Sequence, residues 1–288
     1  MKIARYLSNG ADRVGVVEGD VVREIHWSLR DLLVLAATGG ATENLPYTGH
    51  EATVDEVTFL PPAVGGGRVF CAGINYVEHQ RESADVFVAE VPQEPILFLK
   101  DSSTLAGAGA VLHLPKEVSE QFDWEAELGV VIGAPVRNVS AEAALHAVAG
   151  FTVVNDITAR DLQTKHVQWT LGKNSVAATP IGPWIVTKDE LGAEPELEIS
   201  LRVNEQVKQT GNTRDMIFNV ARLISTISAV MPLMPGDVIA TGTPSGVGFK
   251  RNPPEFLHDG DVVETRIEGI GALINPVHTG LISRAAAS

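Results

Sequence analysis

Cysteine, basic residues and long apolar runs are all scarce in this chain of 288 residues. The one cysteine, Cys71, excludes a disulfide bond within the chain, and we expect a small buried side chain in a cytoplasmic protein. Only 22 lysine and arginine residues stand against 36 aspartate and glutamate residues, which gives a formal charge of −14. Nucleic acids and anionic membranes bind basic surfaces, so neither is an expected partner.

No apolar run approaches the roughly 20 residues that span a membrane, and residues 1–6 do not begin a secretion signal. We therefore expect a soluble protein. With 44% hydrophobic residues, the chain can bury a substantial core. Because the surface is acidic, an anionic substrate would need a local positive centre, supplied by a metal ion or by selected lysine and arginine side chains.

Turn residues divide the chain near residue 62. Residues 1–62 are expected to form a small β-rich N-terminal domain with one helix near 32–37, and residues 63–288 the main domain. Many apolar strand candidates and few helical periods, clearest at 141–149 and 216–231, predict an α+β, β-dominated fold and not a doubly wound nucleotide-binding sheet. The main-domain strands are expected at 68–71, 96–99, 125–132, 151–155, 181–186, 197–203, 238–241 and 262–267.

The segment 123–132 reads as a strand with apolar side chains on one face and three carboxylates on the other. Glu125 and Glu127 share the carboxylate face. Two glutamates in this i, i+2 pattern form either a solvated outer face or a pair of oxygen ligands for a divalent cation. Spacing alone favours the solvated face.

Asp156 follows an apolar strand candidate and would add a third carboxylate at a sheet edge. An all-oxygen site made by Glu125, Glu127 and Asp156 suits Mg²⁺ or Mn²⁺ and suits Zn²⁺ poorly. Lys173 is the candidate for the nearby positive charge that three carboxylates around a divalent ion would require. Such a site leaves coordination positions for water or for a chelating 2-oxo acid.

Six separate motifs, in matching order over roughly residues 65–278, resemble the fumarylacetoacetate hydrolase family. The similarity is to its short metal-dependent members, which include acylpyruvases, oxaloacetate decarboxylases and 2-hydroxyhepta-2,4-diene-1,7-dioate isomerases. Agreement among independent motifs makes a chance likeness improbable. The motifs lie at 73–82, 123–133, 155–163, 182–184, 235–244 and 267–271.

The resemblance implies a mixed β-roll catalytic domain, a homodimer, and Mg²⁺ or Mn²⁺ held by Glu125, Glu127 and Asp156. It also implies a small oxo-acid substrate. Fold and metal transfer between members of a family better than the reaction does.

The resemblance also implies catalytic roles for three residues. Alone, a His-x-x-Glu pattern is typical of a surface helix. At this position in the motif, His79 and Glu82 would form a dyad in which the carboxylate orients the imidazole as a general base. Lys173 would polarise a substrate oxygen and stabilise an enolate.

Four further residues match substrate-binding positions of the family: Tyr76, Arg160, Gln163 and Thr243. A guanidinium suits a carboxylate, although an ion pair between Arg160 and a protein acid is the alternative. Lys100 is a possible second positive group.

One segment departs from the family pattern. After Lys173, many relatives carry a small residue followed by Phe-Asp-x-Phe, whereas this chain has residues 174–179, Asn-Ser-Val-Ala-Ala-Thr. The loss of an acid and two aromatic rings predicts a less polar, roomier wall near the metal, and therefore an altered substrate.

The leading functional hypothesis is a divalent-metal-dependent hydrolase that cleaves a carbon–carbon bond in a β-diketo or 2,4-dioxo acid, such as an acylpyruvate or fumarylpyruvate. The alternative is an oxaloacetate-type decarboxylase or a 2-hydroxy-dienedioate isomerase on the same metal site. A third hypothesis is a catalytically silent, metal-stabilised binding protein.

Overall fold

The computed structural model describes residues 1–40, 44–63 and 65–280. Among these residues there are nineteen strands and seven α-helices, most of the helices short. The predicted β-dominated α+β class is therefore confirmed. The last eight residues of the expected main domain, 281–288, lie outside the described ranges.

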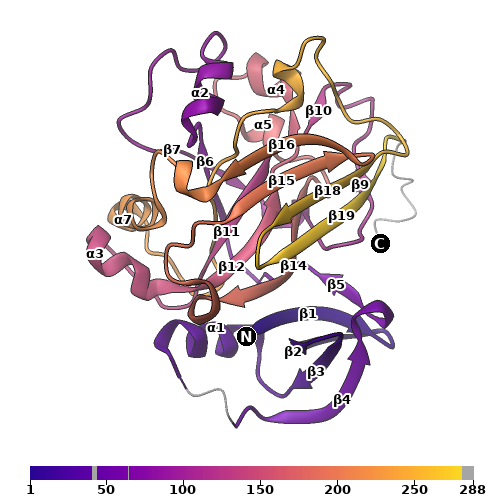
Figure 1. Cartoon of the computed structure of the whole chain (residues 1–288), viewed down its shortest axis with the longest axis vertical. Coiled ribbons are helices and arrows are strands. Elements are labelled where there is room, and N and C mark those ends of the chain that lie inside the picture. The colour runs from indigo at the N-terminus through magenta and orange to yellow at the C-terminus, as the bar shows by residue number, and fades with distance from the viewer. Residues whose placement is uncertain (41–43, 64, 281–288) are drawn as a thin grey trace.

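One large mixed sheet runs from the N-terminal unit into the main body (Figure 1). Most neighbouring strands are antiparallel, but β17 and β6 run parallel. Two short strands, β5 (Thr58–Leu60) and β8 (Leu105–Ala106), pair with β1 and β14 at its side. The ten strands of its main path, in spatial order, are β4 (Tyr47–Thr53), β3 (Val21–Ile25), β2 (Ala11–Glu18), β1 (Lys2–Ser8), β14 (Thr179–Thr187), β12 (Val148–Asn155), β11 (Ala126–Ile132), β17 (Val238–Ala240), β6 (Val69–Gly73) and β7 (Ile96–Lys100).

A second sheet of five strands crosses the main body, and a two-stranded ribbon, β10 (Phe122–Asp123) with β13 (Thr158–Ala159), lies beside it. Its strands, in spatial order, are β16 (Gln206–Asn212), β15 (Glu198–Val203), β18 (Val262–Ile267), β19 (Gly271–His278) and β9 (Leu112–His113). No helix of the described residues is long and apolar enough to cross a membrane. The helices are α1 (Leu29–Thr38), α2 (Val77–Ser83), α3 (Ala141–Ala144), α4 (Arg160–Lys165), α5 (Thr170–Lys173), α6 (Lys188–Leu191) and α7 (Val220–Val230).

The N-terminal unit joins the main body through the edge of β14. Lys2 and Ile3 of β1 pair with Val186 and Ile185 of β14, and the amino group of Met1 donates to Thr187 Oγ1 at 2.6 Å. The boundary expected near residue 62 therefore separates two stretches of sequence that share one hydrogen-bonded sheet.

The helix predictions differ from the structure at their ends. The segment 32–37 lies inside α1, which begins with a capping box between Ser28 and Asp31. The segment 216–231 is helical only from Val220, because the Asn219 side chain caps the first turn by accepting from Arg222 N. The prediction for 141–149 is wrong beyond residue 147, since Val148 begins β12 and pairing with β11 overrides local helical periodicity.

Strand β11 is buried on both faces along all seven residues. Leu128, Val130 and Ile132 lie in one hydrophobic cluster, and Val131, on the opposite face, lies in a second cluster with the buried side of α1. Its carboxylate-bearing face is therefore not the solvated outer face that the spacing left open.

Candidate active site

Three carboxylates converge where β11 begins and β12 ends. Ala126 lies opposite Asn155 in the antiparallel pair, and Asp156 N donates to Glu125 O at 2.9 Å, so Asp156 lies beside Glu125. Glu127 projects from the same face of β11, two residues on. Glu125, Glu127 and Asp156 each offer an oxygen within 4.8 Å of the others, and all three are buried. Strand pairing thus joins residues that are 29 to 31 positions apart in sequence.

Two buried lysines neutralise part of this charge. Lys173, at the end of α5, donates to Glu125 Oε2 at 2.8 Å and to Asp156 Oδ2 at 2.7 Å. Lys100, the last residue of β7, donates to Asp156 Oδ1 at 2.6 Å and to two backbone carbonyls. Lys173 lies beside the carboxylates, as expected from the sequence, and lines the cavity. Lys100 contacts Asp156 but does not line the cavity, so it supports that carboxylate from the protein interior.

Among the described residues, lysine or arginine forms ion pairs with Glu125 and Asp156 but not with Glu127, and the pKa shifts follow this difference. Burial alone would raise the pKa of Glu125, but Lys173 and Arg160 outweigh it and hold that pKa below its usual range. Burial, followed by the charges of Asp156 and Glu125, raises the pKa of Glu127 well above its usual range. A buried cluster of oxygen donors with surplus negative charge fits a hard divalent cation such as Mg²⁺ or Mn²⁺.

Arg160 is held by protein acids on two sides. Its Nε donates to Asp123 Oδ1 at 2.6 Å, and its Nη1 donates to Gln163 Oε1 at 2.9 Å. Its Nη2 lies 2.7 Å from Glu125 Oε1 as an ion pair, but at an angle outside hydrogen-bond geometry. The ion-pair alternative for Arg160 is therefore present in the structure. Arg160 and Gln163 also line the cavity, so a substrate group can reach both.

The His79–Glu82 dyad lies on α2, one turn apart. His79 Nδ1 and Glu82 Oε1 are 2.8 Å apart, and His79 is 3% exposed. With a proton on Nδ1 shared with Glu82, the other ring nitrogen carries the lone pair that can accept a proton. Glu82 also accepts from Gly246 N, at 3.1 Å to Oε1 and 3.0 Å to Oε2, so the carboxylate fixes α2 to the loop after β17.

Thr243 reaches the cavity from the loop after β17, where Gly242 N donates to Glu127 Oε2 at 2.9 Å. Gly242 has a φ of +92°, and a Cβ there would lie 2.8 Å from Ala72 O, so the close approach requires glycine. The buried amide of Gln209 donates to Thr243 Oγ1 and accepts from Ala126 N. Gln209 therefore ties this loop to the start of β11.

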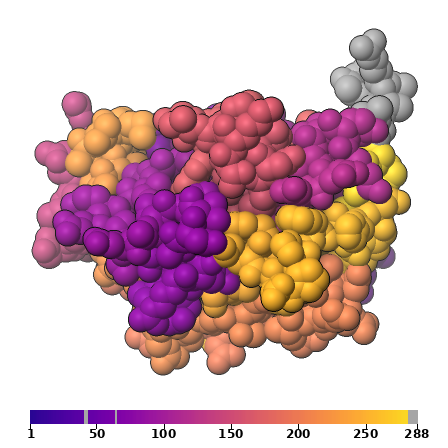
Figure 2. All heavy atoms as spheres, turned by 90° about the horizontal axis from the view of Figure 1, so that it is seen from above, coloured from indigo at the N-terminus to yellow at the C-terminus, as the bar shows by residue number. Residues whose placement is uncertain are grey.

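These groups enclose a cavity of about 10 Å³, room for roughly one water molecule. Its walls combine the dyad histidine, two of the carboxylates, Lys173, Arg160, Gln163 and Thr243 with the rings of Phe87 and Trp169. Seen from above, the purple segment with α2, the pink segment with α4 and α5 and the gold segment after β17 adjoin one another at the surface (Figure 2).

Three predicted site residues do not line this cavity: Tyr76, Glu82 and Asp156. Glu82 and Asp156 contact residues that do line it, whereas Tyr76 lies elsewhere. It is the N-cap residue of α2 and lines a separate pocket of about 360 Å³ with Glu78 and Asp215. Burial raises the pKa of its hydroxyl above the usual range. A role in substrate binding stays a prediction for Tyr76.

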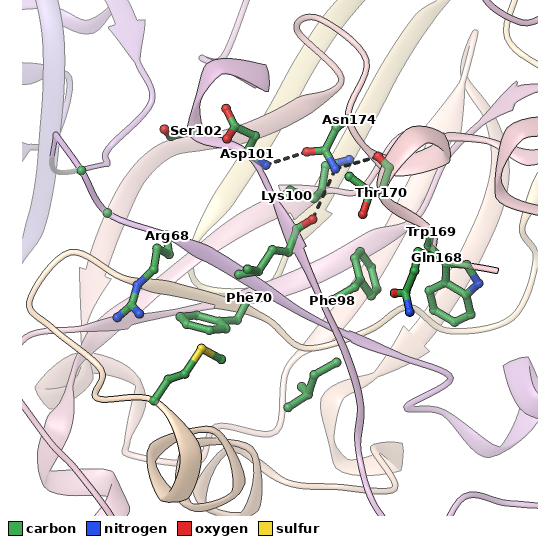
Figure 3. A pocket seen from close by; sticks show the side chains of 15 residues that line it. Arg68, Phe70, Phe98, Lys100, Asp101, Ser102, Gln168, Trp169, Thr170 and Asn174 are labelled. Carbon is green, nitrogen blue, oxygen red and sulfur yellow. Dashed lines mark hydrogen bonds between the residues drawn. The ribbon is translucent and has the colours of Figure 1, made fainter. Parts of the chain in front are cut away.

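The departing segment 174–179 also lies away from the cavity wall. Asn174 accepts from Asp101 N at 2.6 Å and donates to Thr170 O at 2.9 Å (Figure 3). It lines a larger pocket of about 630 Å³ along β7, which shares only Trp169 with the carboxylate cavity. The expected roomier wall is therefore not found, since aromatic rings from other segments close the cavity.

Three residues of the site were missed from the sequence: Phe87, Trp169 and Gln209. They come from three different segments and reach the cavity or its supporting loop only through tertiary contacts. Asp123 was noted on the carboxylate face, but its pairing with Arg160 carries no local signal in the sequence.

Comparison with known proteins supports the resemblance along the whole chain. Residues 68–278 match the family model described as fumarylacetoacetate (FAA) hydrolase C-terminal, and residues 1–62 match Rv2993c-like, N-terminal. A human protein named oxaloacetate tautomerase FAHD2A, mitochondrial, is 45% identical over 224 residues, 77% of this chain and 70% of that protein. A 2,4-didehydro-3-deoxy-L-rhamnonate hydrolase of a Sphingomonas strain is 40% identical over 277 residues, 94% of each chain.

Solved structures agree with these matches. The 2-hydroxyhepta-2,4-diene-1,7-dioate isomerase from Mycobacterium marinum has a TM-score of 0.80 at 34% identity, covering 97% of this chain and 98% of that one. A fumarylacetoacetate hydrolase from Exiguobacterium antarcticum has a TM-score of 0.81 at 35% identity, covering 97% and 99%. With its clustered carboxylates and its matched motifs, the chain belongs to the fumarylacetoacetate hydrolase family of enzymes.

Proposed function

We propose that this enzyme is a divalent-metal-dependent hydrolase that cleaves a carbon–carbon bond in a 2,4-dioxo acid. The observation that carries the proposal is that His79, held at Nδ1 by Glu82 at 2.8 Å, lines the same cavity as Glu125 and Glu127. Hydrolysis needs a base that removes a proton from water, whereas proton transfer within a substrate or loss of CO₂ needs no activated water.

Glu125, Glu127 and Asp156 would hold Mg²⁺ or Mn²⁺. When bound, the ion acts as a Lewis acid that polarises the oxygens of an oxo acid. The chain's own groups do the rest: Arg160 and Gln163 bind the substrate carboxylate or carbonyl, and Thr243 adds a hydroxyl.

His79 accepts a proton from water, and the resulting hydroxide adds to the C4 carbonyl of the substrate. The bond between C3 and C4 then breaks. C4 leaves as a carboxylic acid, and the electron pair of the broken bond stays on C3 as the enolate of a 2-oxo acid. Lys173 is placed to stabilise that enolate, and the proton that His79 took from water is returned to C3, which completes the 2-oxo acid and regenerates the neutral imidazole. Glu82 holds the imidazole in position throughout.

The test is turnover by metal-stripped protein, with and without Mg²⁺ or Mn²⁺, on acylpyruvates, fumarylpyruvate, oxaloacetate and a 2-hydroxy-dienedioate, with products identified by mass. Metal-restored conversion of a dioxo acid into two acids is the expected result. His79→Ala should lower kcat about 10²- to 10⁴-fold, with Glu78→Gln on the exposed side of α2 as the control. Hydrolysis that survives in His79→Ala would refute the dyad mechanism.

A second candidate is tautomerisation or decarboxylation of oxaloacetate. Its support is that the human relative named an oxaloacetate tautomerase is 45% identical. Isomerisation of a 2-hydroxy-dienedioate is the third reaction on the same groups, by likeness to the solved isomerase. A change of tautomer, release of CO₂ or a shifted double bond in the same assay would select among them.

A homodimer and a cytoplasmic location also stay proposals. Light scattering of the purified chain tests the dimer, and microscopy of a tagged chain tests the location. The name of the human relative includes the word mitochondrial, so microscopy will show whether this chain shares that location.

A further inference from the structure

The carboxylate cavity adjoins a second pocket that is open to a longer substrate. This pocket, called the tail pocket below, has a volume of about 260 Å³ and is lined by residues 86–88, Ile96, Gln163, Thr164, His166 and Trp169. It shares three side chains with the carboxylate cavity, those of Phe87, Gln163 and Trp169. The 630 Å³ pocket along β7 shares only Trp169, so the tail pocket is the better continuation of the cavity.

Two aromatic rings lie on the wall that the cavity and the tail pocket share. The rings of Phe87 and Trp169 meet edge to face, with centroids 5.4 Å apart. Trp169 is seated against Gly73, where a Cβ would lie 2.6 Å from Cζ3 of the indole. Trp169 packs on the backbone at Gly73 and on the ring of Phe98, with ring centroids 5.5 Å apart. These two contacts hold the indole in position.

The tail pocket is uncharged apart from one histidine. Val86, Val88 and Ile96 supply apolar surface, while Thr164 and His166 supply hydrogen-bonding groups. Among the described residues that line it there is no lysine, arginine, aspartate or glutamate. Val86 and Thr164 are exposed, so a second carboxylate placed here would stay partly hydrated but would gain no permanent positive partner, whereas carbon and hydroxyl groups would find suitable contacts.

We propose that the tail pocket binds the distal end of the substrate, and that this end is an uncharged alkyl or hydroxyalkyl chain, not a second carboxylate. The proposal rests on the proposed function for one point only, that the oxo-acid head lies at the carboxylates. A short substrate such as oxaloacetate would leave the tail pocket empty.

The test uses two six-carbon ligands that differ only at the far end. 2-Oxohexanoate ends in a methyl group and 2-oxoadipate ends in a carboxylate. Neither has a carbonyl at C4, so both report binding without cleavage. By calorimetry on the Mg²⁺-loaded protein we expect 2-oxohexanoate to bind about tenfold more tightly or better. Equal or tighter binding of 2-oxoadipate would overturn the proposal.

A gain of charge gives the sharper experiment. His166→Lys adds a permanent positive charge on the wall of the tail pocket, and it should raise the affinity for 2-oxoadipate about tenfold while leaving oxalate binding unchanged. Val167→Lys is the matched control, because Val167 is 97% exposed and does not line the pocket. An equal gain in both variants would mean general attraction by surface charge and would overturn the assignment of the pocket.

The two proposals fail separately. Cleavage of 2,4-dioxo acids is assayed on the same preparations. If no dioxo acid is cleaved but the preference for the uncharged ligand and the His166→Lys effect hold, the hydrolase reaction is refuted and the tail pocket stands. If cleavage occurs but 2-oxoadipate binds as tightly as 2-oxohexanoate, the reaction stands and the tail pocket is refuted.

Discussion

The N-terminal sheet and the carboxylate site both contain paired acidic and basic side chains, but the pairs lie in opposite surroundings. In the N-terminal unit, Arg5 pairs with Asp12 across β1 and β2 with both side chains at least 35% exposed. In the site, Lys100 and Asp156 pair at 2.6 Å with neither side chain exposed. Water already stabilises the first pair, while each charge of the second depends on its partner.

The difference shows what each region requires of its charges. The exposed ion pairs leave no buried net charge in the N-terminal part of the sheet. The site places four carboxylates, Asp123, Glu125, Glu127 and Asp156, against three cations, Lys100, Arg160 and Lys173. The surplus negative charge costs stability in the metal-free protein, and it is the charge that a divalent ion would neutralise.

The largest effect on folding is expected from Lys100→Met. The change leaves buried Asp156 with Lys173 as its remaining cationic partner and removes one of the three cations that balance four buried carboxylates. The metal-free protein should therefore lose about 3–5 kcal/mol in free energy of unfolding. Urea unfolding followed by circular dichroism measures this loss. A loss below about 1 kcal/mol would mean that the buried and exposed pairs do not differ as described.

Glu127→Gln should separate metal binding from stability. Because the pKa of Glu127 is raised by burial and by neighbouring carboxylates, removing its charge should leave the metal-free protein as stable as the wild type or more so. Affinity for Mn²⁺ should fall at least about 100-fold. Calorimetry and urea unfolding measure the two effects, with exposed Glu120→Gln as control. Unchanged Mn²⁺ affinity would exclude Glu127 as a ligand.

The pH dependence of the metal-free protein follows from the same group. A raised pKa for Glu127 means that the folded chain holds this proton more tightly than the unfolded chain, whose value is near 4.5. The contribution is complete below pH 4.5 and is lost as the pH rises through the folded pKa. The Tm of the wild type should therefore fall relative to that of Glu127→Gln as the pH rises; parallel curves would contradict the shift.

The smallest effect is expected from Arg5→Met, the matched partner of Lys100→Met. It breaks an ion pair of the same kind on an exposed sheet, so the free energy of unfolding should change by less than about 1 kcal/mol. Salt should reduce even this change, because exposed charges are screened. A loss as large as that of Lys100→Met would show that the N-terminal sheet depends on its surface charges.

Residue spacing predicted those parts of the site that lie within one strand segment or one helical turn, and the family resemblance added Lys173, Arg160, Gln163 and Thr243, which line the cavity. Glu125 and Glu127 are two residues apart on a strand, and His79 and Glu82 are three apart on a helix, so spacing alone brings each pair together. Asp156 required the pairing of two strands, which the apolar pattern of 151–155 indicated only in part.

The rest of the site depends on contacts that no local pattern records. Phe87 and Trp169 line the cavity from segments more than 80 residues apart, and Gln209, from the second sheet, contacts its supporting loop at Thr243. The helix expected over 141–149 ended early for the same kind of reason, since Val148 pairs with Ile132 across the sheet. Both misses come from tertiary pairing that competes with local preference.

The pairing of β1 with β14 has a consequence for how this enzyme can be shortened. Removing residues 1–62 would uncover the backbone of β14 at Ile185 and Val186, together with the apolar side chains that β1 covers. A bare strand edge of this kind recruits strands from other chains. We therefore expect the isolated main domain to aggregate unless another strand pairs with that edge. The N-terminal unit would then protect the enzyme from self-association, although it contributes no residue to the carboxylate cavity.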